Sequence, residues 1–196
     1  MATITDVDLQ LMSPAFKNGE NIPPKYTCEG ENINPSLEIK GLPRQTKTLA
    51  IIMEDPDTGH GVFDHWLAWN ILPNEPIKEN SVPGVYGRNS FGKNGYGGPC
   101  PPTGKHRYFF HVYALDAELN LPPGSDKKEL LNAMQGHILA KAELMGLYQK
   151  SKLCPTAGTM TFSYISPDNE RHKPFRNPHW IRQPIFFHVF SLLPDK

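Results

Sequence analysis

The sequence predicts a mainly β protein with an antiparallel core and a few flanking helices. Its 196 residues include 20 prolines and 16 glycines, a share that favours a loop-rich β protein over a helical bundle. Apolar runs typical of strands come before the patterns typical of helices, so the strand–helix–strand alternation of a parallel sheet is missing. A chain of this length is sufficient for one domain with a buried core.

Three segments carry the strand signal. The first strand is expected at Thr48–Asp55, where a continuous apolar run ends in acidic residues. The third, Arg107–Leu115, is rich in aromatic and β-branched residues, which pack well on a pleated sheet. The second is expected at His65–Ile71, and its alternation places three side chains on one face: His65, Leu67 and Trp69.

Two amphipathic helices are expected after these strands. Asp126 followed by Glu129 matches a capping box, in which the two residues satisfy backbone N–H groups at the start of a helix. Gly136 is expected to end this first helix. A second helix is expected from Ile138 to about Tyr148, because apolar residues recur there at helical spacing.

A long glycine-rich loop precedes the third strand. The segment Pro83–Lys105 contains seven glycines and shows neither a strand nor a helix period. A connection of this length without secondary structure is usually functional or disordered. In its last part, "GGPCPPTGKHRY", glycines allow a ligand to approach the backbone and prolines stiffen the chain. We therefore expect a fixed loop around a small ligand.

The composition excludes several classes of partner. The formal net charge is zero, which gives no reason to expect binding to nucleic acid or to a membrane surface. The sequence shows no secretory signal and no apolar run of the roughly 18 residues that a membrane helix needs. Cys28, Cys100 and Cys154 are too few, and odd in number, for a disulfide framework. We expect a soluble cytoplasmic protein without integral membrane association.

Three short motifs supply the residues that can carry chemistry. "EDPD" ends the first strand, "DHW" begins the second, and "KHRY" begins the third. If these strands are neighbours, one end of the sheet brings together Asp55, Asp57, His65, His106 and Tyr108. His106 and Tyr108 are two residues apart and should face the same way. Asp55 and Asp57 should do the same if the chain stays extended, which Pro56 favours.

This residue set suits a small anion. Two imidazoles and a phenol are hydrogen-bond donors, and the backbone N–H groups of Gly97 and Gly98 can add more, so a phosphate group fits the site. A carboxylate next to phosphate would repel it. Asp55 or Asp57 must therefore orient and charge a histidine, be protonated, or meet a cationic part of the ligand. A zwitterion with a phosphate and an amine satisfies both halves of the site.

Each motif also has an explanation without function. A "DPD" sequence is commonly a turn, and the glycine-rich loop can be a plain surface connection. His65 beside Trp66 can be a core histidine with satisfied hydrogen bonds. Cys100, between two prolines, fits a small buried residue better than a nucleophile.

The sequence predicts no cofactor and no metal centre. A metal held by Asp55, His65 and His106 is geometrically conceivable, but these residues lack a recognised metal-ligand spacing. The GxSxG and HExxH motifs of common hydrolases are missing. The alternative function is a phosphoester or ester hydrolase that uses the same histidines and carboxylates as acid and base.

Taken in chain order, the motifs resemble one family. "DPD", "DHW", "GYGGPCPPTGKHRYFFHVYAL" and "GHILAKAELMGLY" are similar to the phosphatidylethanolamine-binding protein (PEBP) family, in particular its bacterial and archaeal Raf-kinase-inhibitor-like branch. Upstream, "IPPKYTCEGENINPSLEIKGLP" resembles the opening of that branch. The resemblance covers about residues 9–149 and implies a single domain with a β-sandwich core. Its two antiparallel sheets would have a Greek-key arrangement with a few flanking helices.

The resemblance also implies a function. It suggests a protein without enzymatic activity that binds phosphate or a phosphorylethanolamine-like head group. Through that site it would regulate a protein partner such as a kinase, and a homodimer is a further expectation. By position in the motifs, the implied ligand-binding residues are Asp55, Asp57, His65, Gly98, Pro99, His106 and Tyr108.

The C-terminal part departs from the family pattern. Members of this branch usually stop soon after "ELMGLY", whereas this chain continues for 46 residues. We therefore predict a PEBP-like domain over residues 1–150 and an atypical extension over residues 151–196. The sequence leaves open whether the extension is poorly packed or forms a lid over the site, for which the candidates are Phe175, His179 and Trp180.

Overall fold

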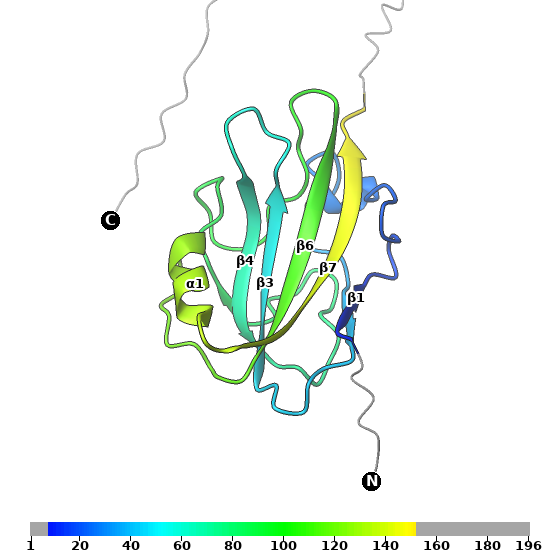
Figure 1. The fold of residues 1–196 in the computed structure, drawn as a ribbon. Helices are drawn as coiled ribbons and strands as arrows, with labels where there is room; N and C mark the ends of the chain where they lie inside the picture. The colour runs from blue at the N-terminus through cyan, green and yellow to red at the C-terminus, as the bar shows by residue number, and fades with distance from the viewer. Residues whose placement is uncertain (1–7, 152–196) are drawn as a thin grey trace, which may run out of the picture. The chain divides into compact units, whose positions relative to one another are not determined.

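The computed structural model describes residues 8–151, so nearly all of the predicted C-terminal extension lies outside the described residues. Strands dominate this part of the chain (Figure 1). In chain order the elements are β1 (Gln10–Met12), the 3-10 helix η1 (Pro24–Tyr26), β2 (Glu38–Lys40), β3 (Thr48–Asp55), β4 (Phe63–Ile71), β5 (Val85–Tyr86), β6 (Lys105–Leu115), α1 (Lys127–Met134) and β7 (Ile138–Gln149).

The strands form two antiparallel sheets. The larger sheet has the order β5-β4-β3-β6-β7, and β1 pairs with β2 in a small second sheet. All pairs of neighbouring named strands are antiparallel. The mainly β, antiparallel fold predicted from the sequence is confirmed, and the three predicted strands correspond to β3, β4 and β6.

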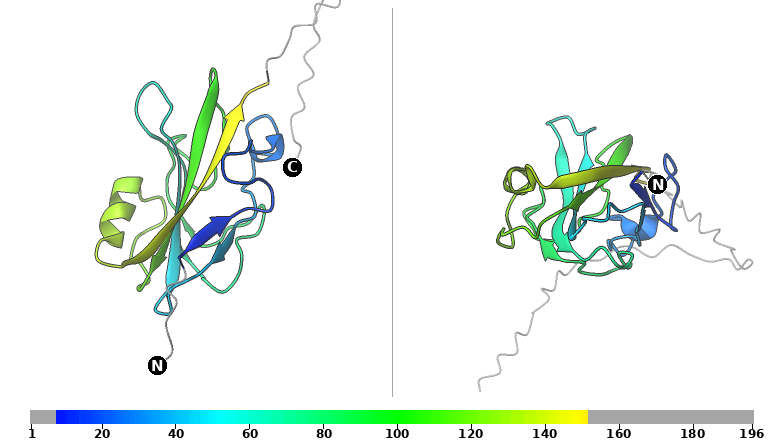
Figure 2. Two further views of the ribbon diagram at one scale, coloured as in Figure 1. Left: turned by 45° about the vertical axis from the view of Figure 1, so that its right-hand side comes forward. Right: turned by 60° about the horizontal axis from the view of Figure 1, so that its bottom comes forward.

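Both faces of the large sheet are covered. Figure 2 shows α1 on one side of the sheet and β1 with β2 on the other. Strand β3 contributes to both cores: Leu49, Ile51 and Met53 pack in one cluster, whereas Ala50 and Ile52 pack in the cluster that contains residues of α1. Because both faces are buried, β3 is a continuous apolar run rather than an alternating one.

The predicted second helix is wrong, because Ile138–Gln149 forms strand β7. It pairs with β6 along its whole length, from Lys105 opposite Gln149 to Leu115 opposite Ile138. The alanine, leucine, glutamate and lysine residues of β7 favour a helix locally, but pairing with a long central strand overrides that preference. The predicted first helix is confirmed as α1, with the capping box of Asp126 and Glu129.

The sequence argued against a disulfide framework, and the described residues contain a single disulfide that the sequence did not predict. Cys28 and Cys100 are bonded, with Cα atoms 5.4 Å apart. An odd number of cysteines still allows one disulfide, and the number alone does not reveal which two cysteines the fold brings together. Cys154 lies outside the described residues. No helix within residues 8–151 is long and apolar enough to cross a membrane.

Candidate functional site

The predicted site residues meet at one end of the large sheet. Strand β3 ends at Asp55, whereas β4 and β6 begin at this end because they run antiparallel to β3. In Figure 1 the β3–β4 loop and the loop before β6 both lie at the upper end of the sheet. Four side chains are brought together there and are almost fully buried: Asp55 (2% exposed), His65 (3%), His106 (8%) and Tyr108 (0%). We call these four residues the polar cluster.

Asp55 and His106 form the centre of the polar cluster. The Oδ2 atom of Asp55 lies 2.7 Å from Nδ1 of His106. The N–H group at Nδ1 donates to the carboxylate, which fixes the orientation of the ring. The Nε2 atom is then available to a ligand, and it can donate a hydrogen bond when the ring is protonated.

His65 reaches the polar cluster through an irregularity in β4. Met53 pairs with Trp66 and Glu54 pairs with Asp64, so His65 is an extra residue in a β-bulge. Its ring contacts that of Tyr108, with centroids 5.2 Å apart. The prediction that His65 shares a face with Leu67 and Trp69 is therefore wrong, because the bulge turns the histidine to the other face.

The protonation state of His65 follows from its surroundings. Its Nδ1 lies 2.7 Å from the carbonyl oxygen of Gly97, an acceptor, so Nδ1 carries a proton. Burial lowers the pKa of His65 below its ordinary value of 6.5, against the opposing effect of that hydrogen bond. At neutral pH the ring is neutral, and its Nε2 presents a lone pair.

Tyr108 supplies a hydroxyl without a partner. This buried group forms no hydrogen bond of normal geometry with any residue in the described range 8–151, although the carboxylate of Asp55 and the backbone at Cys100 lie close to it. Burial, together with the nearby carboxylate of Asp55, raises the pKa of Tyr108 far above its ordinary value of 10. The ring stacks beside that of His106, with centroids 6.5 Å apart, as the two-residue spacing predicts. A buried, unpaired hydroxyl is costly and is often explained by a ligand.

Asp57 does not join the polar cluster. Its carboxylate accepts two hydrogen bonds from the guanidinium of Arg107, at 3.0 and 2.6 Å, and one from the Arg107 backbone N–H. These hydrogen bonds lower the pKa of Asp57 to about 2. The expectation that Asp55 and Asp57 face the same way is wrong, because the chain turns at Pro56 and the backbone N–H of Asp57 donates to Asp55.

The glycines of the loop before β6 allow close packing instead of donating to a ligand. The N–H of Gly97 donates to the carbonyl of His65, and the N–H of Gly98 donates to Asn32. The suggestion that these amides bind an anion is therefore not supported. A Cβ atom on Gly98 would lie 2.3 Å from the carbonyl oxygen of Tyr26. The neighbouring Pro99 accepts a hydrogen bond from the N–H of Cys28.

A cavity borders the polar cluster. It has a volume of about 360 Å³, and Phe91 and Gly97 are among its lining residues. Phe91 packs edge-on against the His65 ring at 5.3 Å and against Phe63 at 4.7 Å. Neither phenylalanine could be recognised as a site residue from the sequence, because only the folded loop places them beside the histidine.

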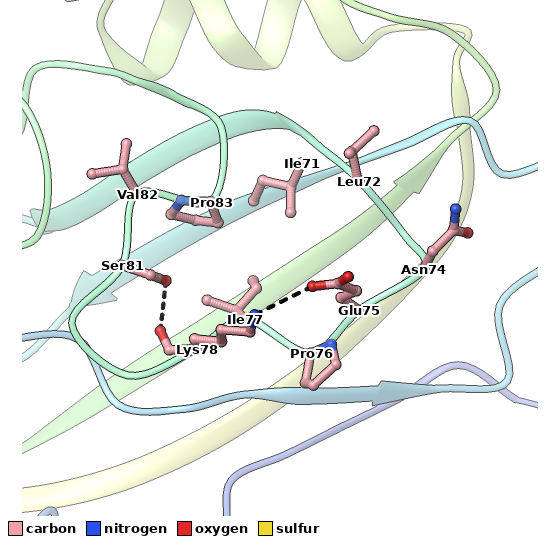
Figure 3. Close-up of a pocket in the computed structure, with 10 residues that line it drawn as sticks. All are labelled: Ile71, Leu72, Asn74, Glu75, Pro76, Ile77, Lys78, Ser81, Val82 and Pro83. Carbon is pink, nitrogen blue, oxygen red and sulfur yellow. Dashed lines mark hydrogen bonds and ion pairs between the residues drawn. The ribbon is translucent and has the colours of Figure 1, made fainter.

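A second cavity, of about 370 Å³, lies at the opposite end of β4 (Figure 3). Its charged lining residues Glu75 and Lys78 approach each other to 3.6 Å, and the hydroxyl of Ser81 donates to the backbone carbonyl of Lys78. The two charged groups of this cavity therefore already pair with each other, and we do not regard it as the functional site.

A different group of charges lies on the α1 face at the same end of the sheet. The ammonium of Lys127 contacts the carboxylates of Glu54 and Asp64, and His111 Nε2 lies 3.3 Å from Glu54. The hydrogen bond with His111 and the ammonium of Lys127 lower the pKa of Glu54 to about 2, although burial opposes this shift. We call these four residues the charged cluster. No group of side chains within residues 8–151 has the arrangement of a metal site.

The matches to known proteins cover the part of the chain that the structure describes, residues 8–151. The sequence profile of the family described as "Phosphatidylethanolamine-binding protein" matches residues 12–149. A UPF0098 protein of Archaeoglobus fulgidus is 52% identical over 147 residues, covering 70% of this chain and 50% of the relative. A UPF0098 protein of Pyrococcus horikoshii is 50% identical over 150 residues, covering 71% and 76%. The chain thus spans about half the length of the Archaeoglobus relative.

Two solved structures share the fold. A PEBP homologue from Chlamydia trachomatis superimposes with a TM-score of 0.72 and 44% sequence identity, over 74% of this chain and 99% of the other. Escherichia coli YbcL, described as a member of the mammalian PEBP family, gives a TM-score of 0.68 and 29% identity over the same shares.

Proposed function

This chain belongs to the phosphatidylethanolamine-binding protein family, and from that premise we propose that its polar cluster binds a small phosphate-bearing anion. The ligand is free phosphate or a phosphorylethanolamine-like head group. The Nε2 atoms of His65 and His106 and the hydroxyl of Tyr108 contact it directly. Asp55 orients His106. Gly98 and Pro99 shape the loop beside the site, and Asp57 holds Arg107 next to it.

The observation that carries this proposal is the unpaired hydroxyl of Tyr108 between two histidines that have been fixed by other contacts. Nδ1 of His106 is used by Asp55, and Nδ1 of His65 is used by Gly97. The remaining polar atoms of the three rings are available to one ligand. Both nearby carboxylates are already engaged, Asp55 by His106 and Asp57 by Arg107, so the phosphate and not the amine should provide most of the recognition.

The test is a calorimetric titration of the full-length protein with phosphate, phosphorylethanolamine and sulfate between pH 5.5 and pH 8. Sulfate keeps a constant charge over this range, so any change in its affinity reports the protein. A histidine must be protonated before its Nε2 can donate. Because the pKa of His65 is below 6.5, sulfate should bind more tightly as the pH falls. Its affinity should decrease by up to about tenfold for each pH unit above the pKa of the responsible histidine.

Controls make this titration specific. His106→Ala should abolish measurable binding, whereas His137→Ala removes an exposed histidine that pairs with Asp116 and should leave it unchanged. Similar affinities for phosphate and phosphorylethanolamine are expected. Sulfate binding that is independent of pH, or that survives in His106→Ala, would show that the polar cluster is not the anion site.

We propose that the bound anion matters because it links the protein to a partner such as a kinase. A phosphorylated side chain presents the same phosphate chemistry as the small ligands, so the site can recognise a phosphorylated segment of the partner. We further propose a cytoplasmic location and a homodimer. Fractionation of cells and light scattering of the purified protein test these two points.

Binding without turnover fits the cluster better than hydrolysis. The Asp55–His106 pair has the geometry of a general base, which supports the hydrolase alternative. However, Tyr108 is a poor nucleophile because its pKa is far above 10, and Cys100 is bonded to Cys28. A screen with phosphoesters and esters should detect no turnover. Turnover that disappears in His106→Ala would establish the enzyme instead.

A further inference from the structure

The disulfide lies in the wall of the cavity that borders the polar cluster. Both Cys28 and Cys100 line this space of about 360 Å³, together with Gly97 and Gly98. Cys28 is exposed, whereas Cys100 is partly buried between Pro99 and Pro101. A small molecule that enters the cavity therefore reaches the bonded sulfurs, and Cys28 is the more accessible of the two. The volume falls within the range of small-ligand pockets, roughly 300–1,000 Å³.

The lining of this cavity favours an anion. Lys93 is its charged lining residue, accompanied by the amides of Asn32 and Asn89, and no carboxylate occurs among the described residues around it. None of the ion pairs found within residues 8–151 involves Lys93. A positive wall without a neutralising partner attracts anionic small molecules and raises their local concentration.

We propose that the Cys28–Cys100 disulfide is a thiol-exchange site for a small anionic thiol of the glutathione class. The thiolate of the small molecule attacks Sγ of Cys28 and forms a mixed disulfide. The Cys28–Cys100 bond breaks, its electron pair passes to Sγ of Cys100, and this thiolate takes a proton from water. A second small thiolate then attacks the small-molecule sulfur of the mixed disulfide. It releases the oxidised small thiol as its disulfide and leaves Cys28 as a thiolate.

This exchange regulates anion binding by the polar cluster. That consequence rests on the proposed function. The disulfide ties the loop before β6 to the segment after η1. The same two segments are joined by hydrogen bonds from Cys28 N–H to Pro99, at 3.1 Å, and from Gly98 N–H to Asn32, at 2.7 Å. The loop carbonyl of Gly97 in turn fixes His65. Breaking the covalent link leaves only non-covalent contacts to hold the loop, so the site is less preorganised for an anion.

The exchange is tested on the full-length protein carrying Cys154→Ser, so that only the bonded pair can react. Oxidised protein is mixed with glutathione or with the neutral thiol 2-mercaptoethanol at equal thiolate concentrations. Acid-quenched samples are followed by intact mass spectrometry and peptide mapping. Glutathione should react at least about threefold faster, an advantage that salt reduces, and its adduct should lie on Cys28. In Lys93→Gln the advantage should disappear, whereas Lys47→Gln, at an exposed site near the other end of the sheet, should retain it.

Three results would overturn the exchange site. These are equal rates for the two thiols, an adduct on Cys100, and reduction by thioredoxin but not by glutathione. Phosphate titration of the same protein then tests the regulation. Reduction in place, or Cys28→Ser with Cys100→Ser, should weaken phosphate binding by at least about fivefold while a folded state remains in a thermal melt. Equal binding by oxidised and reduced protein would refute the regulation alone. A lack of binding by the oxidised protein would refute the proposed function and the regulation, and the mass measurements would still decide the exchange.

Discussion

The two faces of the large sheet carry polar residues that are neighbours in the same strands but differ in their interactions. On the α1 face, Glu54 and Asp64 lie against Lys127, and each carboxylate has a cationic partner. On the other face, one residue further along each strand, Asp55 and His65 join the polar cluster. The alternation of β3 separates Glu54 from Asp55, and the β-bulge in β4 separates Asp64 from His65.

The difference lies in which polar groups are satisfied. In the charged cluster the ammonium and the carboxylates lie against opposite charges, and His111 Nδ1, which forms no hydrogen bond within residues 8–151, still lies 3.1 Å from the carboxylate of Glu143. The charged cluster should therefore contribute to stability and be indifferent to ligands. The polar cluster retains a buried hydroxyl without a partner, on Tyr108, and should bind a ligand at some cost in stability. This contrast leads to three predictions, from the largest expected effect to the smallest.

The largest effect is expected from Lys127→Met. This change removes the cation, leaves the partly buried Asp64 without a charged partner and leaves Glu54 beside it with His111 alone. The free energy of unfolding, measured by urea denaturation at pH 7, should fall by about 2–3 kcal/mol. Phosphate affinity should stay within about twofold of the parent, since the charged cluster lies on the other face of the sheet.

Lys128→Met is the matched control for this change. It alters the next residue of α1, which is exposed, and should change stability by less than about 0.5 kcal/mol. If Lys127→Met were as stable as this control, the charged cluster would not be a stabilising element. A large loss of phosphate affinity in Lys127→Met would show that the two faces are coupled.

What the sequence could and could not predict depends on whether a feature follows from local pattern or from contacts between residues distant in the sequence. Strands β3 and β6 and the convergence of Asp55, His106 and Tyr108 followed from local pattern, because strand ends in an antiparallel sheet must meet. The β-bulge at His65 depends on pairing with β3 and leaves no mark in a single sequence. The same holds for β7, whose local preference is helical, and for the turn at Pro56 that sends Asp57 to Arg107. Tertiary pairing decided each of these features.

Tyr108→Phe is expected to have an intermediate effect. It should increase stability and weaken phosphate binding. Removing a buried hydroxyl that has no protein partner should raise the free energy of unfolding by about 1 kcal/mol. Phosphate affinity should fall about tenfold, equivalent to about 1.4 kcal/mol, because one ligand contact is lost. Urea denaturation and calorimetry of the same preparation measure both quantities.

Tyr113→Phe provides the comparison for this variant, since it removes a hydroxyl from the same strand on the α1 face. Its phosphate affinity should equal that of the parent. A Tyr108→Phe protein that loses stability and binds phosphate normally would mean that the hydroxyl serves the fold, and the proposed contrast between the two clusters would fail.

The smallest effect is expected from Asp57→Asn, which tests the boundary of the polar cluster. The side chain of Arg107 is about half exposed, at 52%, so the ion pair with Asp57 is largely screened by solvent and should contribute less than about 1 kcal/mol to stability. The backbone N–H of Arg107 can still donate to the amide oxygen of asparagine. Phosphate affinity by calorimetry should therefore change by less than about twofold. A loss as large as that of Tyr108→Phe would place Asp57 inside the site after all, because a screened surface pair has no other route to the ligand. Asp57 would then be a ligand-binding residue although it already has an ion-pair partner. The contrast between the two faces of the sheet would no longer separate ligand-binding groups from stabilising groups.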